Sequence, residues 1–298
     1  MAKHIMVFGA DIHGNMNQFE KLVDYAINVS ADSLVLGGDI APKDLPSDKF
    51  ISGQRSFLEN DLQDIIYMFK KALPDSNVFL MMGNDDCAAN LDVLEKHDPD
   101  LYTIIHEKRV KLTEDFDLVG YANVPITPFG IKDWEKFDLS HAQSGLGKEY
   151  AFRKSITYRF DGYKSKGNKW QRFLFTPDLE KLDSIQKDLE KDLFTQNSKK
   201  TIYAFHSPPN NTALDQILGG LYKQHVGSFA VREFIEKNQP QLTLHGHIHE
   251  TVAVSGQFCD YIGKTLCLTS GNDNYSDKLI LLALNIYKSN SVERVELT

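Results

Sequence analysis

Five apolar runs in this sequence each end in a polar cluster, and this repeated arrangement restricts the fold more than any other feature. The runs have the length and composition of buried strands, and apolar residues at helical spacing separate several of them. The clusters are Asp11-Ile12-His13, Gly37-Gly38-Asp39, Gly83-Asn84-Asp85-Asp86, His206 and Gly246-His247-Ile248-His249. Because ligands bind beyond the carboxyl ends of the strands in an open α/β sheet, we expect these clusters to converge in one crevice.

The spacing of apolar residues predicts an α/β protein in which strands and helices alternate. The expected strands lie at 3–9, 33–36, 77–82, 109–112, 117–121, 201–205, 241–245, 252–254, 264–268, 279–286 and 291–297. The expected helices lie at 17–29, 56–73, 88–96, 178–194 and 228–237. The runs after residue 251 predict a second, more antiparallel sheet. We therefore expect one α/β domain over residues 1–298, with two sheets covered by helices.

The composition is that of an ordinary globular enzyme. The chain has 298 residues, of which 42% are hydrophobic and 25% charged. No apolar run approaches the ~18–20 residues that cross a bilayer, and we expect neither a membrane association nor a signal peptide. The three cysteines are too few for a disulfide framework or a thiolate zinc site, which predicts a cytoplasmic protein. A net charge of −8 argues against a surface that coats nucleic acid or membrane. The sequence indicates no oligomeric state.

The polar clusters supply the donor atoms of a divalent metal site. They contain imidazoles, carboxylates and one carboxamide, but no thiolate. In Asp11-x-His13 and His247-x-His249, the spacing of two places both side chains on one side of an extended backbone. Each fragment alone also suits a tight turn or a core histidine, whereas the five together, each after a strand, predict a metal centre.

The order of these clusters resembles that of the calcineurin-like metallophosphoesterases, and most closely the bacterial and archaeal cytoplasmic phosphoesterases of that family. The shared pattern is D-x-H, G-G-D, G-N-x-[D/E], a lone His and G-H-x-H, running from Asp11 to His249. The resemblance implies a four-layer α-β-β-α sandwich and a dinuclear metal centre. Nitrogen and oxygen ligands without a thiolate suit Mn, Fe, Zn, Ni or Co. The resemblance further implies hydrolysis of phosphoesters, small molecules or nucleotides among them, by a hydroxide that bridges the two metals.

The resemblance also assigns the ligands by position. It places Asp11, His13 and His249 on one metal, Asn84, His206 and His247 on the other, and Asp39 as the bridge between them. We place Asp39 and Asn84 among the catalytic residues as well.

The residue after Asn84 departs from the family pattern. Many members carry a histidine there, but this chain has Asp85. An ionised carboxylate repels a phosphate, so we expect Asp85 to be turned away, protonated or bridged by water. Because a diester carries one negative charge fewer than a monoester, the sequence favours a phosphodiesterase. The alternatives are a phosphomonoesterase or phosphoprotein phosphatase with the same metals, and a non-catalytic scaffold of the same fold.

The missing histidine leaves the leaving-group acid to be found elsewhere. His225, just before an expected helix, is a candidate for that acid. The alternative for His225 is a solvent-exposed or helix-capping role.

A variable basic and aromatic segment at about 145–175 differs from the rest of the chain. Residues 148–172 contain eight basic and two acidic residues, a net charge of +6, with aromatic residues interleaved. One interpretation is a rim that binds nucleic acid and stacks bases on the aromatic rings. The other, which we favour, is an exposed hairpin whose aromatic residues pack on the sheet and whose basic residues are solvated.

Overall fold

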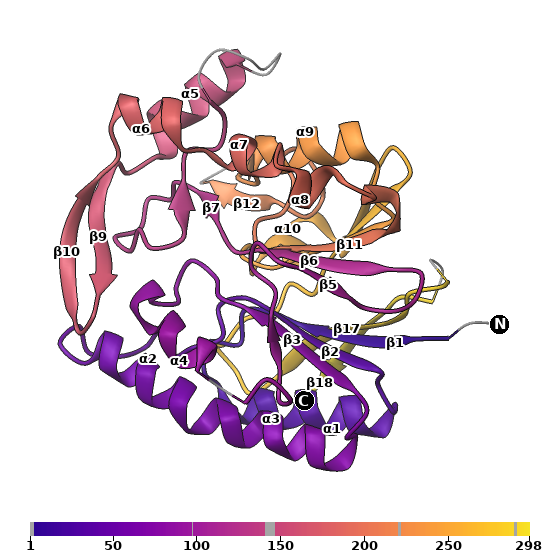
Figure 1. Cartoon of the computed structure of the whole chain (residues 1–298). Helices are drawn as coiled ribbons and strands as arrows, with labels where there is room; N and C mark the ends of the chain where they lie inside the picture. The colour runs from indigo at the N-terminus through magenta and orange to yellow at the C-terminus, as the bar shows by residue number, and fades with distance from the viewer. Residues whose placement is uncertain (1–2, 97, 141–146, 220–221, 289–290) are drawn as a thin grey trace.

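The computed structural model describes residues 3–96, 98–140, 147–219, 222–288 and 291–298. Two six-stranded sheets lie one above the other at the centre of the fold (Figure 1). The first has the order β18 (Glu293–Leu297), β17 (Leu279–Asn285), β1 (Ile5–Gly9), β2 (Ser33–Gly37), β3 (Asn77–Met81), β4 (Thr103–Ile104). The second has the order β15 (Cys259–Ile262), β16 (Thr265–Thr269), β14 (Leu242–His245), β11 (Thr201–Phe205), β6 (Asp117–Tyr121), β5 (Arg109–Lys111).

Helices cover the outer faces of both sheets (Figure 1). The first sheet is covered by α1 (Met16–Asn28), α2 (Phe50–Glu59), α3 (Asp61–Ala72) and α4 (Leu91–Glu95). The second is covered by α7 (Ile185–Leu189), α8 (Asp192–Thr195) and α9 (Phe229–Asn238). The other helices are α5 (Gly147–Thr157), α6 (Pro177–Leu182), α10 (Thr251–Ser255) and the short 3-10 helices Ala88–Asn90 and Ser198–Lys200. This arrangement is the α-β-β-α sandwich that the family resemblance implies.

Side chains of the central strands alternate between two separate cores. On β1, Met6 and Phe8 face the core between the sheets, and Val7 faces the helices. β1 runs parallel to β2, and the register pairs Val7 with Leu34 and Phe8 with Val35. Because successive residues of a strand point to opposite faces, a strand buried on both sides reads as a continuous apolar run.

The amphipathic stretch 178–194, expected as one helix, is divided into α6, α7 and α8. The break lies at Asp183 and Ser184, both of which have extended backbone. The Ser184 side chain accepts the backbone N–H of Lys187 and begins α7 there, while the backbone N–H of Ile185 donates to the carbonyl of Phe137. The serine cap and the hydrogen bond to a distant loop thus break the chain into separate helices, although the spacing of apolar residues favours one continuous helix.

The C-terminal strands do not form a sheet of their own, which corrects the expectation of a separate antiparallel sheet. Strand β17 pairs antiparallel with β1 and carries β18 beside it, so both belong to the first sheet. Residues 252–254, expected as a strand, lie in α10, and the expected helix 56–73 is two helices that meet at Asn60.

Three short pairings complete the fold. They are β7 (Val124–Pro125) with β8 (Glu135–Lys136), β9 (Asp161–Lys166) with β10 (Lys169–Leu174), and β12 (Gln216–Gly219) with β13 (Tyr222–His225). The basic segment thus forms helix α5 and the β9–β10 hairpin, which in Figure 1 stands at one side of the two sheets and reaches toward α2. Among the described residues, none of the helices has the length and apolar character needed to cross a membrane.

Candidate metal centre

The loops that follow the central strands place their polar side chains in a common region between the two sheets. The backbone N–H groups of Asp11 and His13 donate to the carbonyls of Gly38 and Asp39, which joins the loop after β1 to the loop after β2. From the second sheet, the N–H of Gly246 donates to the carbonyl of His206, 3.0 Å away. The expected convergence of the five clusters is therefore observed.

Four of the predicted site residues have a backbone that L-amino acids rarely adopt. The φ angles of Asp11, His13, Asp39 and His247 are 58°, 49°, 52° and 70°. Left-handed backbone at non-glycine residues costs free energy and persists only where the surroundings impose it. The loops therefore hold a strained backbone at the four residues whose side chains they direct toward the site.

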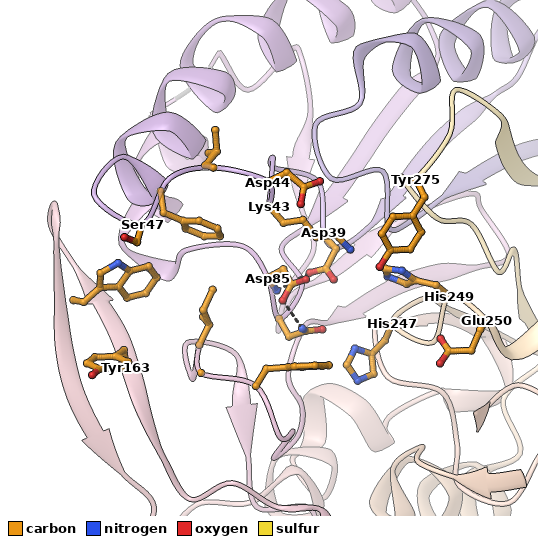
Figure 2. Close-up of a pocket in the computed structure, with 17 residues that line it drawn as sticks. Asp39, Lys43, Asp44, Ser47, Asp85, Tyr163, His247, His249, Glu250 and Tyr275 are labelled. Carbon is orange, nitrogen blue, oxygen red and sulfur yellow. Dashed lines mark hydrogen bonds between the residues drawn. The ribbon is translucent and has the colours of Figure 1, made fainter. Parts of the chain in front are cut away.

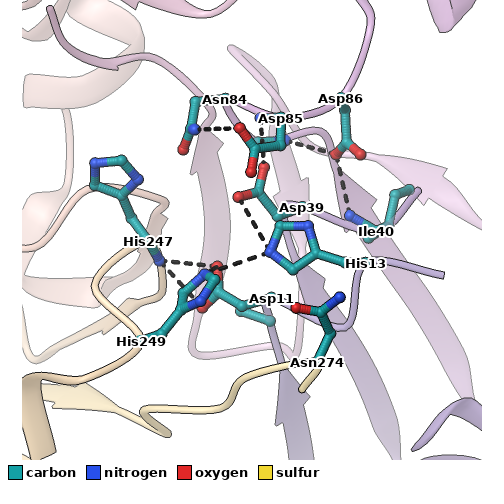
Figure 3. Close-up of polar contacts among 12 residues, drawn as sticks. Asp11, His13, Asp39, Ile40, Asn84, Asp85, Asp86, His247, His249 and Asn274 are labelled. Carbon is teal, nitrogen blue, oxygen red and sulfur yellow. Dashed lines mark hydrogen bonds and ion pairs between the residues drawn. The ribbon is translucent and has the colours of Figure 1, made fainter. Parts of the chain in front are cut away.

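One group of donors contains Asp11, His13, Asp39 and His249, whose ligand atoms all lie within 4.8 Å of one another (Figure 3). Nε2 of His13 is 3.3 Å from Nε2 of His249, and Nε2 of His249 is 3.7 Å from Oδ1 of Asp11. Two carboxylates and two imidazoles at this spacing fit a divalent transition metal.

A second group of donors forms around His206. Its Nε2 is 3.2 Å from Oδ1 of Asn84 and 3.3 Å from Oδ2 of Asp39, so Asp39 lies between the two groups. Nδ1 of His206 is 2.9 Å from the carbonyl oxygen of Gly37, which fixes the orientation of the ring. The ring of His247 lies beside that of His206, with centroids 5.4 Å apart, and its backbone N–H donates to the Asp11 carboxylate.

The glycines of the clusters are required by close packing at this centre. A Cβ on Gly83 would lie 2.6 Å from Nε2 of His206 and would overlap Asp39. A Cβ on Gly246 would lie 2.7 Å from Oδ2 of Asp11. Both distances are below any normal carbon contact, so a side chain here would displace the donor atoms.

The protonation states of the histidines differ. Burial lowers the pKa of His13 and of His247 to about 3, so both rings are neutral at pH 7 and able to ligate a metal. For His206, burial is outweighed by the adjacent Asp39 carboxylate, which raises the pKa of His206 to about 10. Metal ligation by His206 therefore requires the loss of a proton.

Two buried residues that sequence reasoning did not assign hold these loops. The carboxylate of Asp86 accepts the backbone N–H groups of Gly83, Ile40 and Ala41. The Asn272 side chain donates to the carbonyl of Asp11 and accepts the N–H of Ile280. Asn272 stands in a polar cluster directly after β16, the same signal that marked the other five clusters.

The sequence matches one known protein family. The family model for calcineurin-like phosphoesterases matches residues 5–251. The chain belongs to the calcineurin-like phosphoesterase family. It is accordingly a metal-dependent hydrolase that acts on phosphoric esters. No curated protein matches the sequence.

Solved structures resemble this phosphoesterase at low sequence identity. One crystal structure matches over 100% of both chains, with 13% identity and a TM-score of 0.61. Protein TT1561 of Thermus thermophilus matches over 99% of both chains, with 15% identity and a TM-score of 0.52. A dimetal phosphatase from Danio rerio covers 99% of this chain and 98% of its own, with 11% identity and a TM-score of 0.48. The first two likenesses establish the fold alone.

The metal centre of this phosphoesterase opens into a cavity of about 780 Å³. Figure 2 shows His247 and His249 at one side of this cavity and Tyr163, from β9, at the other. The full lining consists of Asp39, Lys43, Asp44, Leu45, Ser47, Phe50, Asn84, Asp85, Phe129, Gly130, Ile131, Tyr163, Trp170, His247, His249, Glu250 and Tyr275. The basic and aromatic segment thus contributes two aromatic rings, Tyr163 and Trp170, to the cavity, in addition to any that pack within the fold.

Asp85 faces this cavity beside the metal centre. Its backbone N–H donates to Oδ1 of Asp39 at 2.8 Å, and its own Oδ1 accepts Nδ2 of Asn84 at 2.9 Å. Burial, together with the charge of Asp39, raises the pKa of Asp85 to about 8. In the metal-free protein this environment favours the protonated form of Asp85, whereas two divalent cations bound beside it would favour the carboxylate.

His225 is not one of the residues that line the cavity. Its Nδ1 is 2.7 Å from Oδ1 of Asp215, a buried carboxylate, and this hydrogen bond raises the pKa of His225. The Asp215 carboxylate also accepts the backbone N–H of Gly227, so His225 belongs to the loop that leads into α9. Ser228, rather than His225, caps α9 by accepting the N–H of Val231.

Proposed function

We propose that this phosphoesterase hydrolyses phosphodiesters at a dinuclear metal centre. The observation that carries the proposal is the carboxyl group of Asp85 in the substrate cavity, next to Asp39. Asp44 and Glu250 add two further carboxylates to the lining, and Lys43 is its one lysine or arginine among the described residues. Because a monoester carries one more negative charge than a diester, this lining favours the diester.

The residues present fit two divalent metal ions from the series Mn, Fe, Zn, Ni and Co. Asp11, His13 and His249 would hold one, Asn84, His206 and His247 would hold the other, and Asp39 would contact both. When bound, such a pair neutralises phosphoryl oxygens and activates a water molecule for in-line attack.

The chain's own residues orient this centre. The N–H of Asp85 holds one carboxylate oxygen of Asp39, which leaves Oδ2 facing His206. The Asn84 amide group donates to Asp85, so its carbonyl oxygen is directed at the same point. These contacts support the roles proposed for Asp39 and Asn84. That His225 is the leaving-group acid stays a prediction, which its place outside the cavity lining does not support.

The proposal is tested by stripping the protein of metal, adding back Mn²⁺ and measuring hydrolysis of bis- and mono-p-nitrophenyl phosphate. We expect preferential cleavage of the diester and no activity in the His247→Ala variant. A His106→Asn variant, which removes an imidazole that does not line the cavity, serves as the matched control. A preference for the monoester would overturn the diesterase assignment. Metal binding without cleavage of either ester would favour the scaffold alternative.

Nucleic acid remains a second substrate class, supported only by the charge of residues 148–172. Several of these cations already have partners: Arg153 donates to the carbonyls of Val226 and Gly227, and Lys154 pairs with Glu180. Replacing Lys164, Lys166 and Lys169 together with glutamine should reduce cleavage of a polynucleotide and spare bis-p-nitrophenyl phosphate if this alternative holds.

Two further expectations from the sequence enter the proposal. We propose that residues 1–298 form one domain, which the apolar core shared by both sheets supports. We also propose a cytoplasmic location, supported by Cys87, Cys259 and Cys267, all of which are free thiols.

A further inference from the structure

We propose that the β9–β10 hairpin and Phe50 form a binding wall for an aromatic ring of the substrate, so that the preferred ester is a small nucleoside-type phosphoester. The inference deepens the proposed function and rests on it for the position of the phosphate. Tyr163, Trp170, Phe50 and Phe129 line the same cavity as the metal donors. Figure 2 shows Tyr163 on the side opposite His247 and His249.

The register of the hairpin places Tyr163 and Trp170 on the face opposite its three lysines. Residues directly opposite in an antiparallel pair share a face. Trp170 pairs with Ser165, and Tyr163 pairs with Arg172, so these four residues lie on one face. Lys164, Lys166 and Lys169 lie on the other, where Nζ of Lys164 stands 4.2 Å from the ring centroid of Phe173. The face toward the cavity thus carries Tyr163 and Trp170 together with Arg172, and the three lysines that suggested a polynucleotide lie on the opposite face.

Hydrogen bonds and a ring contact join the wall to the segments beside the metal donors. The Asp133 carboxylate accepts the backbone N–H of Ser165 at 2.7 Å and the N–H of Ala88 at 2.9 Å, and the Ser165 hydroxyl donates to it as well. Ala88 follows the Asn84–Asp86 loop by two residues. Trp170 packs against Phe50 at the start of α2, with ring centroids 5.8 Å apart. A preformed wall loses little conformational entropy when a ring binds.

The exposure of the rings leaves aromatic surface available to a ligand. Phe129 is 60% exposed and Tyr163 is 41% exposed, although both line a cavity. Large aromatic side chains on the surface of a concave site are typical of ligand-binding surfaces. The cavity volume of about 780 Å³ exceeds what a bare phosphate requires and suits a nucleoside phosphate.

The test compares the binding of adenosine 5′-monophosphate and ribose 5-phosphate to the Mn²⁺-loaded protein by calorimetry. Both ligands carry the same phosphate and differ by the base. The ratio of their dissociation constants therefore measures how much the base contributes to binding. We expect adenosine 5′-monophosphate to bind at least about tenfold more tightly, the gain expected from one base stacked on an aromatic side chain. In the Trp170→Ala variant this ratio should fall toward one, while the affinity for ribose 5-phosphate stays unchanged.

Two further variants complete the test. A Tyr163→Leu variant repeats the test at a second position. Unchanged binding of ribose 5-phosphate by the Trp170→Ala and Tyr163→Leu variants shows that they are folded. A Lys166→Gln/Lys169→Gln variant, on the opposite face, should keep the wild-type ratio. Equal binding of the two ligands by the wild type, an unchanged ratio in both aromatic variants, or a loss caused by the lysine variant would overturn the proposal. Because the readout is a ratio of dissociation constants and not a rate of diester hydrolysis, absence of diesterase activity would contradict the proposed function and leave this test intact.

Discussion

The carboxylate of Asp86 accepts the backbone N–H of Ala41 at 2.8 Å, and through this bond the loop that carries Asn84 is fixed to the loop that carries Asp39. The same carboxylate also accepts the N–H of Ile40 and of Gly83, at 3.1 and 2.8 Å. Asp86 is fully buried. It therefore acts as a positioning residue that sets the distance between two donors of the metal centre.

Replacing Asp86 with alanine should weaken both the fold and metal binding. Three buried N–H groups would lose their acceptor, which lowers the free energy of unfolding by about 3 kcal/mol. We expect Mn²⁺ affinity to fall by about 10–100-fold, as for other residues that orient metal ligands. Urea denaturation of the metal-free protein and calorimetric titration with Mn²⁺ measure the two effects.

The control is Asp92→Asn, which removes a carboxylate whose ion pair with Arg55 is on the surface. Surface pairs contribute less than about 1 kcal/mol, so this variant should resemble the wild type in both measurements. Wild-type Mn²⁺ affinity in Asp86→Ala would show that the loops keep their spacing without this carboxylate.

A Gly83→Ala substitution should damage the metal centre by displacing the Asp39 loop. The added methyl group would overlap the carboxylate and the backbone nitrogen of Asp39 and lie 2.6 Å from Nε2 of His206, so the Asp39 loop must move. We expect Mn²⁺ affinity to fall at least about tenfold. Gly147→Ala is the matched control because no atom lies within 4 Å of the position of its Cβ. Equal Mn²⁺ affinity in the two variants would contradict the close packing described at Gly83.

The positions of the candidate ligands could be predicted because each follows a strand that is buried on both faces. Such strands are apolar without interruption, so the first polar residue, such as Asp11 after β1, marks the strand end directly. Parallel neighbours then bring those ends together. Asn272 also follows a buried strand, β16, but the polar residues Thr269 and Ser270 stand between the apolar run and Asn272, so the end of the strand is less clear from the sequence.

The assignment of C-terminal strands to sheets could not be predicted in the same way. Strand β17 is as apolar as β11, and nothing in its side chains distinguishes a place beside β1 from one in the second sheet. The break at Ser184 likewise depends on the carbonyl of Phe137, a residue far along the chain. Contacts between residues far apart in the sequence determine both the place of β17 and the break at Ser184. The local spacing of apolar residues contains no information on such contacts.

The stability of the protein should decrease in acid partly through His106. Burial lowers the pKa of His106 from 6.5 to about 4, and its Nδ1 accepts the backbone N–H of Ala122 at 3.0 Å. Between these two pH values the unfolded chain holds the proton and the folded chain does not. The contribution of His106 is therefore complete above pH 6.5 and is lost as the pH falls toward 4.

A His106→Asn variant removes this titration and keeps an acceptor near the position of Nδ1. Its free energy of unfolding, measured by urea denaturation of the metal-free protein at pH values from about 4.5 to about 7, should depend less steeply on pH than that of the wild type. The variant should also be less stable at neutral pH, since the ring packs edge-on against Trp134 with centroids 5.0 Å apart. Parallel pH profiles for the two proteins would exclude His106 as a source of the acid sensitivity.

Loosening the β9–β10 hairpin should reduce the binding of the aromatic group without disturbing the metals. Asp133 ties Ser165 of this hairpin to Ala88, and an Asp133→Ala variant removes all of these contacts at once. We expect KM for bis-p-nitrophenyl phosphate to rise about tenfold with little change in kcat, because the wall positions a group remote from phosphorus. The matched variant Asp161→Asn removes a carboxylate of the same hairpin that pairs with Arg159 at the surface, and it should leave KM unchanged. A fall in kcat with constant KM in Asp133→Ala would instead place the effect of the hairpin anchor at the metal centre, through the neighbouring Asn84 loop.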